Sequence, residues 1–219
     1  MVRRTVLIFA VCTMMFISFG MISPPVGGST WYVLTEAGKV FENGTKIDDG
    51  YGALDIAASG NDWYVLTKAG KVFKNGTKID EGYTGVAIAA AESDWYLLTE
   101  AGRVFKNGTK IDEDYGSQDI AASGDDWYVL TKAGKVFKNG NKIDDDYSGV
   151  AIAADGADWY LLTESGKVFK NGNMVDEGYG AKDIAAAHGD WYLLTTEGKV
   201  FKNGTKIDEG YGGVGIAAR

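Results

Sequence analysis

The chain has 219 residues, a formal net charge of −8 and one cysteine. Its first thirty residues contain two arginines and no acidic residue, so the remainder carries a net charge of −10. Nucleic acids are bound mainly through clustered Lys and Arg, and this acidic balance therefore argues against a nucleic-acid partner. With Cys12 as the only cysteine, the chain has no internal disulfide framework.

Residues 1–23 have the composition of an export segment. Arg3 and Arg4 precede an uncharged, mostly apolar run from Thr5 to Ser23, which is typical of a signal peptide or of a single membrane anchor. Ser18 and the glycine that follows two residues later permit cleavage, but no Ala-x-Ala site is present, so both alternatives stay open. We expect residues 24–30 to be a linker and the rest of the protein to be secreted, or extracytoplasmic and membrane-anchored only through this segment.

A Trp-Tyr pair recurs every 32 residues and defines the rest of the chain. The six tryptophans are Trp31, Trp63, Trp95, Trp127, Trp159 and Trp191. A fixed period of this length means that one supersecondary unit has been copied and that neighbouring copies bury each other's apolar faces. We expect one domain, a six-repeat unit over residues 31–219.

One unit contains four strand-like runs. These are Trp95 to Thr99, Arg103 to Lys106, Thr109 to Asp112 and Gln118 to Ser123. The dipeptide Asn107-Gly108 predicts a two-residue hairpin, because both central residues of such a turn need positive φ. No stretch has helical length or period, so the domain is predicted to be all-β.

The predicted fold is a six-bladed β-propeller of 32-residue blades. The Ile-Ala-Ala strand is the best candidate for the innermost position, because space is tightest around the central channel. The first copy begins at its Trp strand, whereas the chain ends on an Ile-Ala-Ala strand, Val214 to Ala218. We therefore expect this C-terminal strand to complete the first blade and close the ring, leaving no open edge.

The inner strands also alternate with a period of two copies. Three have Asp before the isoleucine (Asp55, Asp119 and Asp183), and the other three have Val-Ala-Ile or Val-Gly-Ile (Val86, Val150 and Val214). This pattern indicates duplication of a pair, and it predicts three-fold chemical symmetry for the ring.

The run from Asp119 to Phe137, Asp-Ile-Ala-Ala-Ser-Gly-Asp-Asp-Trp-Tyr-Val-Leu-Thr-Lys-Ala-Gly-Lys-Val-Phe, resembles the tectonin-type propeller repeat. It shares the Leu-Thr-x-x-Gly-x-Val core with the regulator-of-chromosome-condensation repeat, which is longer. The resemblance spans residues 31–219 but rests on a short motif. It implies a six-bladed ring that binds carbohydrates or cell-surface glycolipids.

Groups for catalysis or metal binding are scarce. His188 stands in one copy only, in a turn, and is interpreted as a solvated turn residue. Paired acids such as Asp125-Asp126 lie in turns, where Asp is favoured by backbone hydrogen bonding. We predict no enzyme activity, no cofactor and no metal site. Four Asn-Gly-Thr sequons are explained by the hairpin turn, and glycosylation of them stays open.

The candidate ligand-binding residues are six tyrosines in the loops that lead to the inner strands: Tyr51, Tyr83, Tyr115, Tyr147, Tyr179 and Tyr211. These loops are expected on the same face as the Lys/Glu-Ala-Gly hairpins, where aromatic and polar groups together suit sugar rings. Filling the gap between blades is the alternative for these tyrosines, and packing between blades is expected for the Trp series.

The sequence therefore predicts an exported, non-enzymatic, monomeric propeller. Its six near-equal copies favour multivalent, lectin-like recognition of carbohydrate or another polar cell-surface ligand. The alternative is a protein-interaction or envelope scaffold that has no small-molecule sites.

Overall fold

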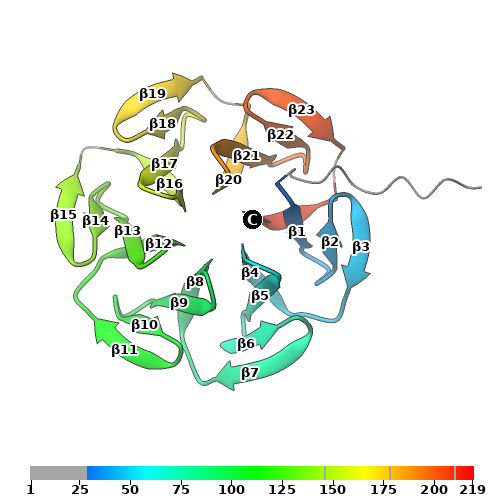
Figure 1. Cartoon of the computed structure of the whole chain (residues 1–219), viewed down its shortest axis with the longest axis horizontal. Coiled ribbons are helices and arrows are strands. Elements are labelled where there is room, and N and C mark those ends of the chain that lie inside the picture. Colours follow the sequence, from blue (N-terminus) through cyan, green and yellow to red (C-terminus); the bar gives the residue numbers. More distant parts are fainter. Residues whose placement is uncertain (1–28, 146, 178, 210) are drawn as a thin grey trace, which may run out of the picture.

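A computed structural model describes residues 29–145, 147–177, 179–209 and 211–219. The predicted export segment and most of the linker lie outside the described residues. The described residues form six four-stranded antiparallel sheets arranged as blades around a central axis (Figure 1). The all-β six-bladed propeller is thus confirmed.

The innermost strands are β4 (Ala53–Ser59), β8 (Gly85–Ala91), β12 (Ser117–Ser123), β16 (Gly149–Asp155), β20 (Ala181–Ala187) and β24 (Gly213–Ala218). Each pairs with a Trp strand: β5 (Asp62–Thr67), β9 (Asp94–Thr99), β13 (Asp126–Thr131), β17 (Asp158–Thr163), β21 (Asp190–Thr195) and β1 (Trp31–Thr35). The inner strands hold the Ile-Ala-Ala segments, as predicted.

The third strands are β2 (Val40–Glu42), β6 (Lys71–Lys74), β10 (Val104–Lys106), β14 (Val136–Lys138), β18 (Val168–Lys170) and β22 (Val200–Lys202). The outer strands are β3 (Thr45–Asp48), β7 (Thr77–Glu81), β11 (Thr109–Asp112), β15 (Asn141–Asp144), β19 (Asn173–Asp176) and β23 (Thr205–Asp208).

The C-terminal strand closes the ring. β24 joins the first blade in the order β24-β1-β2-β3, with Trp31 opposite Ala218 and Val33 opposite Ile216. Arg219 extends this junction, because its guanidinium contacts the hydroxyl of Tyr32 at 2.7 Å and the carboxylate of Glu42 at 3.3 Å. The strand predicted to complete the first blade therefore does so.

The core lies between blades. In one seam, Tyr64 and Leu66 of β5 pack with Ile88 of β8 and with Trp95 and Leu97 of β9. All six tryptophans are buried, with 6 to 8% of their surface exposed. Burial of a large aromatic at the same strand position in each copy fits the packing role expected for the Trp series.

The Asn-Gly turns between third and outer strands have the predicted geometry. Asn107 and Gly108 have φ values of 49° and 79°, which is the type I′ pattern that twists with the flanking strands. The Asn side chain also reaches back to the second strand, where its Oδ1 accepts the backbone N–H of Trp95 at 3.0 Å. Each turn therefore ties the outer half of a blade to the Trp strand.

Among the described residues, no helix is long and apolar enough to cross a membrane.

Candidate functional site

The six predicted tyrosines lie in the seams between neighbouring blades. Tyr51 follows β3, and its ring meets Trp63 and Phe73 of the next blade edge-on, with centroid distances of 6.0 and 5.0 Å. Its backbone N–H approaches the carbonyl of Gly38 at 3.4 Å, so the loop does share a face with the Ala-Gly hairpin. The ring itself turns inward, away from that face.

The tyrosine hydroxyls are occupied by carboxylates. The Tyr83 hydroxyl donates to Asp80 Oδ2 at 2.7 Å, and the other five tyrosines bond in the same way to the aspartate three residues earlier. Burial raises the pKa of Tyr83 to about 12, and the bond to Asp80 acts in the same direction. Tyr179 is the most accessible of the six, with 37% of its surface exposed and its ring stacked on Phe201. Most of these tyrosines thus pack in the seams between blades, and their role in ligand binding stays a prediction.

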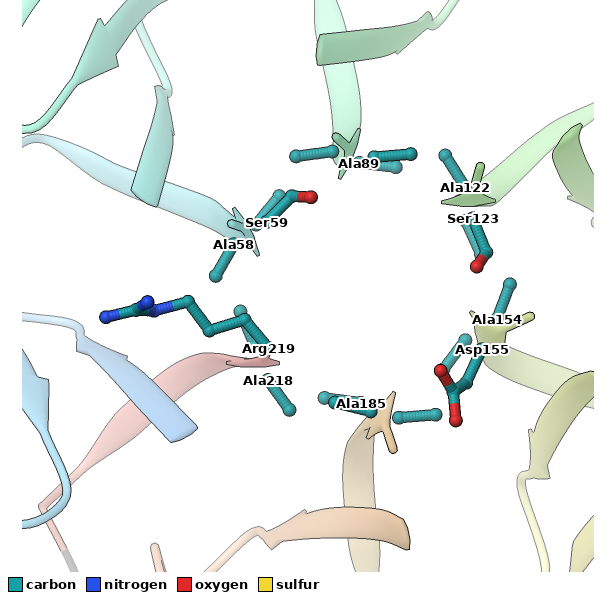
Figure 2. Close-up of a pocket in the computed structure, with 18 of the residues that line it drawn as sticks. Ala58, Ser59, Ala89, Ala122, Ser123, Ala154, Asp155, Ala185, Ala218 and Arg219 are labelled. Atoms are coloured by element: carbon teal, nitrogen blue, oxygen red, sulfur yellow. The ribbon is translucent and has the colours of Figure 1, made fainter. Parts of the chain in front are cut away.

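A cavity of about 630 Å³ occupies one end of the central channel. It is lined by Ile and Ala residues of the inner strands, such as Ile56 and Ala58, and Figure 2 shows the alanines ringing the opening. Its rim consists of the turns that connect inner strands to Trp strands. The volume falls within the range of small-molecule sites, roughly 300 to 1,000 Å³.

Three aspartates sit at the level of the isoleucines and explain the two-copy alternation. Asp55 Oδ1 accepts the backbone N–H of Ile56, and its Oδ2 accepts the N–H of Ile88 in the next blade, both at 2.8 Å. In the same way, Asp119 accepts the N–H groups of Ile120 and Ile152, and Asp183 accepts those of Ile184 and Ile216.

These six N–H groups belong to the inner edges of the sheets. Ile56 lies opposite Val65 of β5 but donates to a carboxylate instead, so its N–H points away from β5 and toward the ring centre. One carboxylate has two oxygens and can satisfy two blades, which is why every second copy needs an aspartate. The intervening copies have Ala87, Ala151 or Gly215 at this position.

The three carboxyl groups have raised pKa values. Burial raises the pKa of Asp55 to about 6 and that of Asp183 to about 8, while the amide hydrogen bonds act in the opposite direction. For Asp119, burial and then the charges of Asp55 and Asp183 raise the pKa well above its ordinary value. The three carboxyl groups therefore interact electrostatically across the channel, and their protonation is coupled.

The rim of the cavity is where the six copies differ most. One position changes from copy to copy as Ser59, Ala91, Ser123, Asp155, Ala187 and Arg219, and the next as Gly60, Glu92, Gly124, Gly156 and His188. By contrast, the Trp-Tyr, Gly-x-Val-Phe and Asn-Gly segments recur in all copies. A repeated scaffold thus carries a ring of unlike side chains around one opening.

Side chains of the rim link neighbouring blades. The Ser123 hydroxyl accepts the N–H of Gly156 at 2.8 Å, and Asp155 accepts the N–H of Gly189. Arg219 points away from the opening (Figure 2) and donates to the carbonyl of Gly60. Glu92 and His188 are exposed and project from the same ring of turns.

Two rim residues hold a backbone conformation that favours glycine. Gly60, Gly124 and Gly156 have φ values of 57°, 55° and 59°, and at the same position Glu92 has 53° and His188 has 55°. In the Glu92 turn only the first central residue has positive φ, the type II′ pattern that prefers Gly there. A side chain at such a position costs roughly 1 kcal/mol.

Sequence reasoning missed this cavity. His188 was interpreted as a solvated turn residue, and it is exposed, but it also lines the cavity together with Glu92 and Asp155. The available signal was the failure of the three residues after Ile-Ala-Ala to repeat. No group of three or more His, Cys, Asp or Glu in the described part of the chain is arranged to hold a metal ion.

No protein-family model matches this chain, and no curated protein is similar to it at a significant level. Solved structures that resemble it include yeast RCC1 (Prp20) bound to Kap60, with a TM-score of 0.57 and 12% identity over 83% of this chain and 74% of that one. Human WBSCR16 has a TM-score of 0.52 and 12% identity, covering 80% and 73%. BBS1N in complex with ARL6DN has a TM-score of 0.51 and 13% identity, covering 73% and 69%.

At these identities the likeness concerns the fold alone. The chain is a six-bladed β-propeller with structural similarity to RCC1-type propellers. The cavity at one end of its central channel has a rim whose side chains differ from blade to blade.

Proposed function

We propose that the protein is an exported, non-enzymatic binding propeller that holds a polar cell-surface ligand, carbohydrate in the first place, at the rim of the central cavity. The observation that carries the proposal is the rim itself, where unlike polar side chains surround a cavity of about 630 Å³. Glu92 and His188 support the proposal further, because both have a positive φ, a backbone conformation that glycine would adopt with less strain. Strain of this kind gathers at functional sites.

The resemblance to tectonin-type repeats supports the choice of carbohydrate. Hydroxyl, amide, carboxylate and imidazole groups from Ser59, Asn61, Asp155 and His188 offer both hydrogen-bond donors and acceptors around the opening. The methyl groups of the alanine wall add apolar surface beside these polar groups, so the cavity offers both kinds of contact to a ligand. Residues 1–23 support export of the domain.

The six-tyrosine site is the second way to bind sugars, and the geometry favours it less. Five of the six rings are buried or half-buried in seams, and their hydroxyls already donate to aspartates. Only Tyr179 keeps substantial exposure. A multivalent array of six equal sites would need the same accessible group in each copy.

A glycan array tests the proposal and separates the two sites. We expect residues 24–219 to bind, a Glu92→Gly/His188→Gly variant to lose at least about tenfold in affinity as it loses two hydrogen-bonding groups, and a variant with all six tyrosines changed to Phe to keep its binding. Tyr→Phe is the matched control, because it retains ring packing and removes only the hydroxyl.

The reverse pattern, with binding lost in the Tyr→Phe variant and kept in the rim variant, would move the site to the seams. No binding by the wild-type domain would contradict the carbohydrate proposal. It would favour the protein-interaction scaffold, which would use the same rim as a docking surface.

A further inference from the structure

The six Asn-Gly turns are chemically labile, and they are held unequally. In an Asn-Gly pair the glycine nitrogen can attack the asparagine Cγ, which forms a five-membered succinimide and releases ammonia. Water then opens the imide to aspartate or isoaspartate. The attack requires the side-chain amide to leave its native hydrogen bonds and swing toward the glycine nitrogen.

In five copies the amide is held at both ends. Asn75 Oδ1 accepts the N–H of Trp63 at 2.9 Å, and its Nδ2 donates to Asp62 Oδ1 at 2.7 Å. The same pair of bonds holds Asn107 with Asp94, Asn139 with Asp126, Asn171 with Asp158 and Asn203 with Asp190. Each of these aspartates is further fixed by a lysine, as Asp62 is by Lys74 at 2.7 Å.

The first copy lacks one of the two bonds. Asn43 Oδ1 accepts the N–H of Trp31 at 3.1 Å, but the residue in the position of Asp62 is Thr30, which offers no carboxylate. The backbone of the turn is the same, since Asn43 and Asn75 both have a φ of 47°. The turn backbones are therefore alike, and the copies differ in the side chains around the amide: Thr30 replaces the aspartate, and Glu42 replaces the lysine that fixes it.

We propose that Asn43 is a spontaneous deamidation site of the folded protein, while the five other Asn-Gly pairs are protected by their aspartates. A hydrogen bond to a charged group is stronger than a neutral one, so its absence makes release of the amide easier. Deamidation at Asn43 places a new carboxylate or an extra backbone methylene beside Glu42. Glu42 pairs with Arg219, so the modification falls on the blade that closes the ring.

The test is peptide mapping by mass spectrometry after prolonged incubation of the full-length protein at mildly alkaline pH. We expect Asn43 to deamidate about tenfold faster than Asn75 or Asn203 in the same molecules. Thr30→Asp combined with Glu42→Lys rebuilds the aspartate and lysine of the other copies and should slow Asn43 to their rate, and Asp62→Thr should raise Asn75 toward the rate of Asn43. In denaturant the six pairs should react at similar rates, which shows that the fold causes the difference.

Equal rates for Asn43 and Asn75 in the folded protein would overturn the proposal. So would a Thr30→Asp/Glu42→Lys variant that remains folded and deamidates at Asn43 as fast as the wild type.

Discussion

A chain that ends at Gly212 should no longer unfold as one cooperative ring. Deletion of β24 removes the partner of β1 and exposes Val33 and Leu34, which are fully buried in the closed ring. It also removes Ile216, of which only 3% is exposed. Loss of this apolar burial and of the strand pairing should cost about 5 kcal/mol or more, which is comparable to the whole stability of many domains.

The measurement is chemical unfolding followed by tryptophan fluorescence, because Trp31 lies on the strand that loses its partner. We expect a lower midpoint and a broad or multistep transition for the truncated chain. Adding a peptide of residues 213–219 in excess should restore part of the loss, since it supplies the missing strand by mass action. A truncated chain as stable as the full one would show that β24 does not close the ring.

The second large effect is expected at the three channel aspartates. Asp119→Ala leaves the N–H groups of Ile120 and Ile152 without their acceptor. An unsatisfied buried donor costs about 1 to 3 kcal/mol, so the variant should lose about 2 to 4 kcal/mol of stability. Asp125→Ala, in the rim turn of the same blade, is the matched control and should change stability by less than about 0.5 kcal/mol.

The same aspartates make stability depend on pH. Their folded-state pKa values lie above those of the unfolded chain, so the folded ring binds more protons than the unfolded chain between pH 4 and about 8. The free energy of unfolding should therefore fall as pH rises through this range, by at least about 1 kcal/mol.

Carboxylates paired with surface lysines have the opposite, but weak, effect on how the free energy of unfolding depends on pH. The Lys74 ammonium lowers the pKa of Asp62, and that stabilising contribution is lost only as pH falls below the ordinary range of aspartate. Such surface pairs contribute little. Changing Asp55, Asp119 and Asp183 together to Asn should abolish the fall in stability, and an unchanged pH profile would show that these groups do not cause it.

Local patterns made most of the fold predictable. The Asn107-Gly108 dipeptide specified its turn because positive φ at both residues is a property of the dipeptide itself. Ring closure followed from counting strands, since Val214 to Ala218 had no Trp strand after it. The alternation at Asp55 was visible, but its cause was not, because it depends on one carboxylate reaching two blades at once.

The site was harder to predict, for a physical reason. Periodicity draws attention to what repeats, and Tyr51 repeats because every seam needs a ring against the Trp and Phe of the next blade. Glu92 and His188 do not repeat, and they come together only because the propeller brings the ends of its inner strands to one opening. The side-chain direction of Tyr51 likewise depends on the rings of the neighbouring blade, together with the bond from its hydroxyl to Asp48.

Two side chains of the rim, Glu92 and His188, are proposed to serve a ligand and not the fold. The most direct test is the free energy of unfolding of the Glu92→Gly/His188→Gly variant, measured in urea beside the wild type. If the two side chains are kept at a cost, relief of their positive φ should outweigh the added flexibility of glycine and raise stability by about 1 kcal/mol. A variant less stable than the wild type would mean that Glu92 and His188 support the ring itself and are not kept for a ligand at a cost to stability.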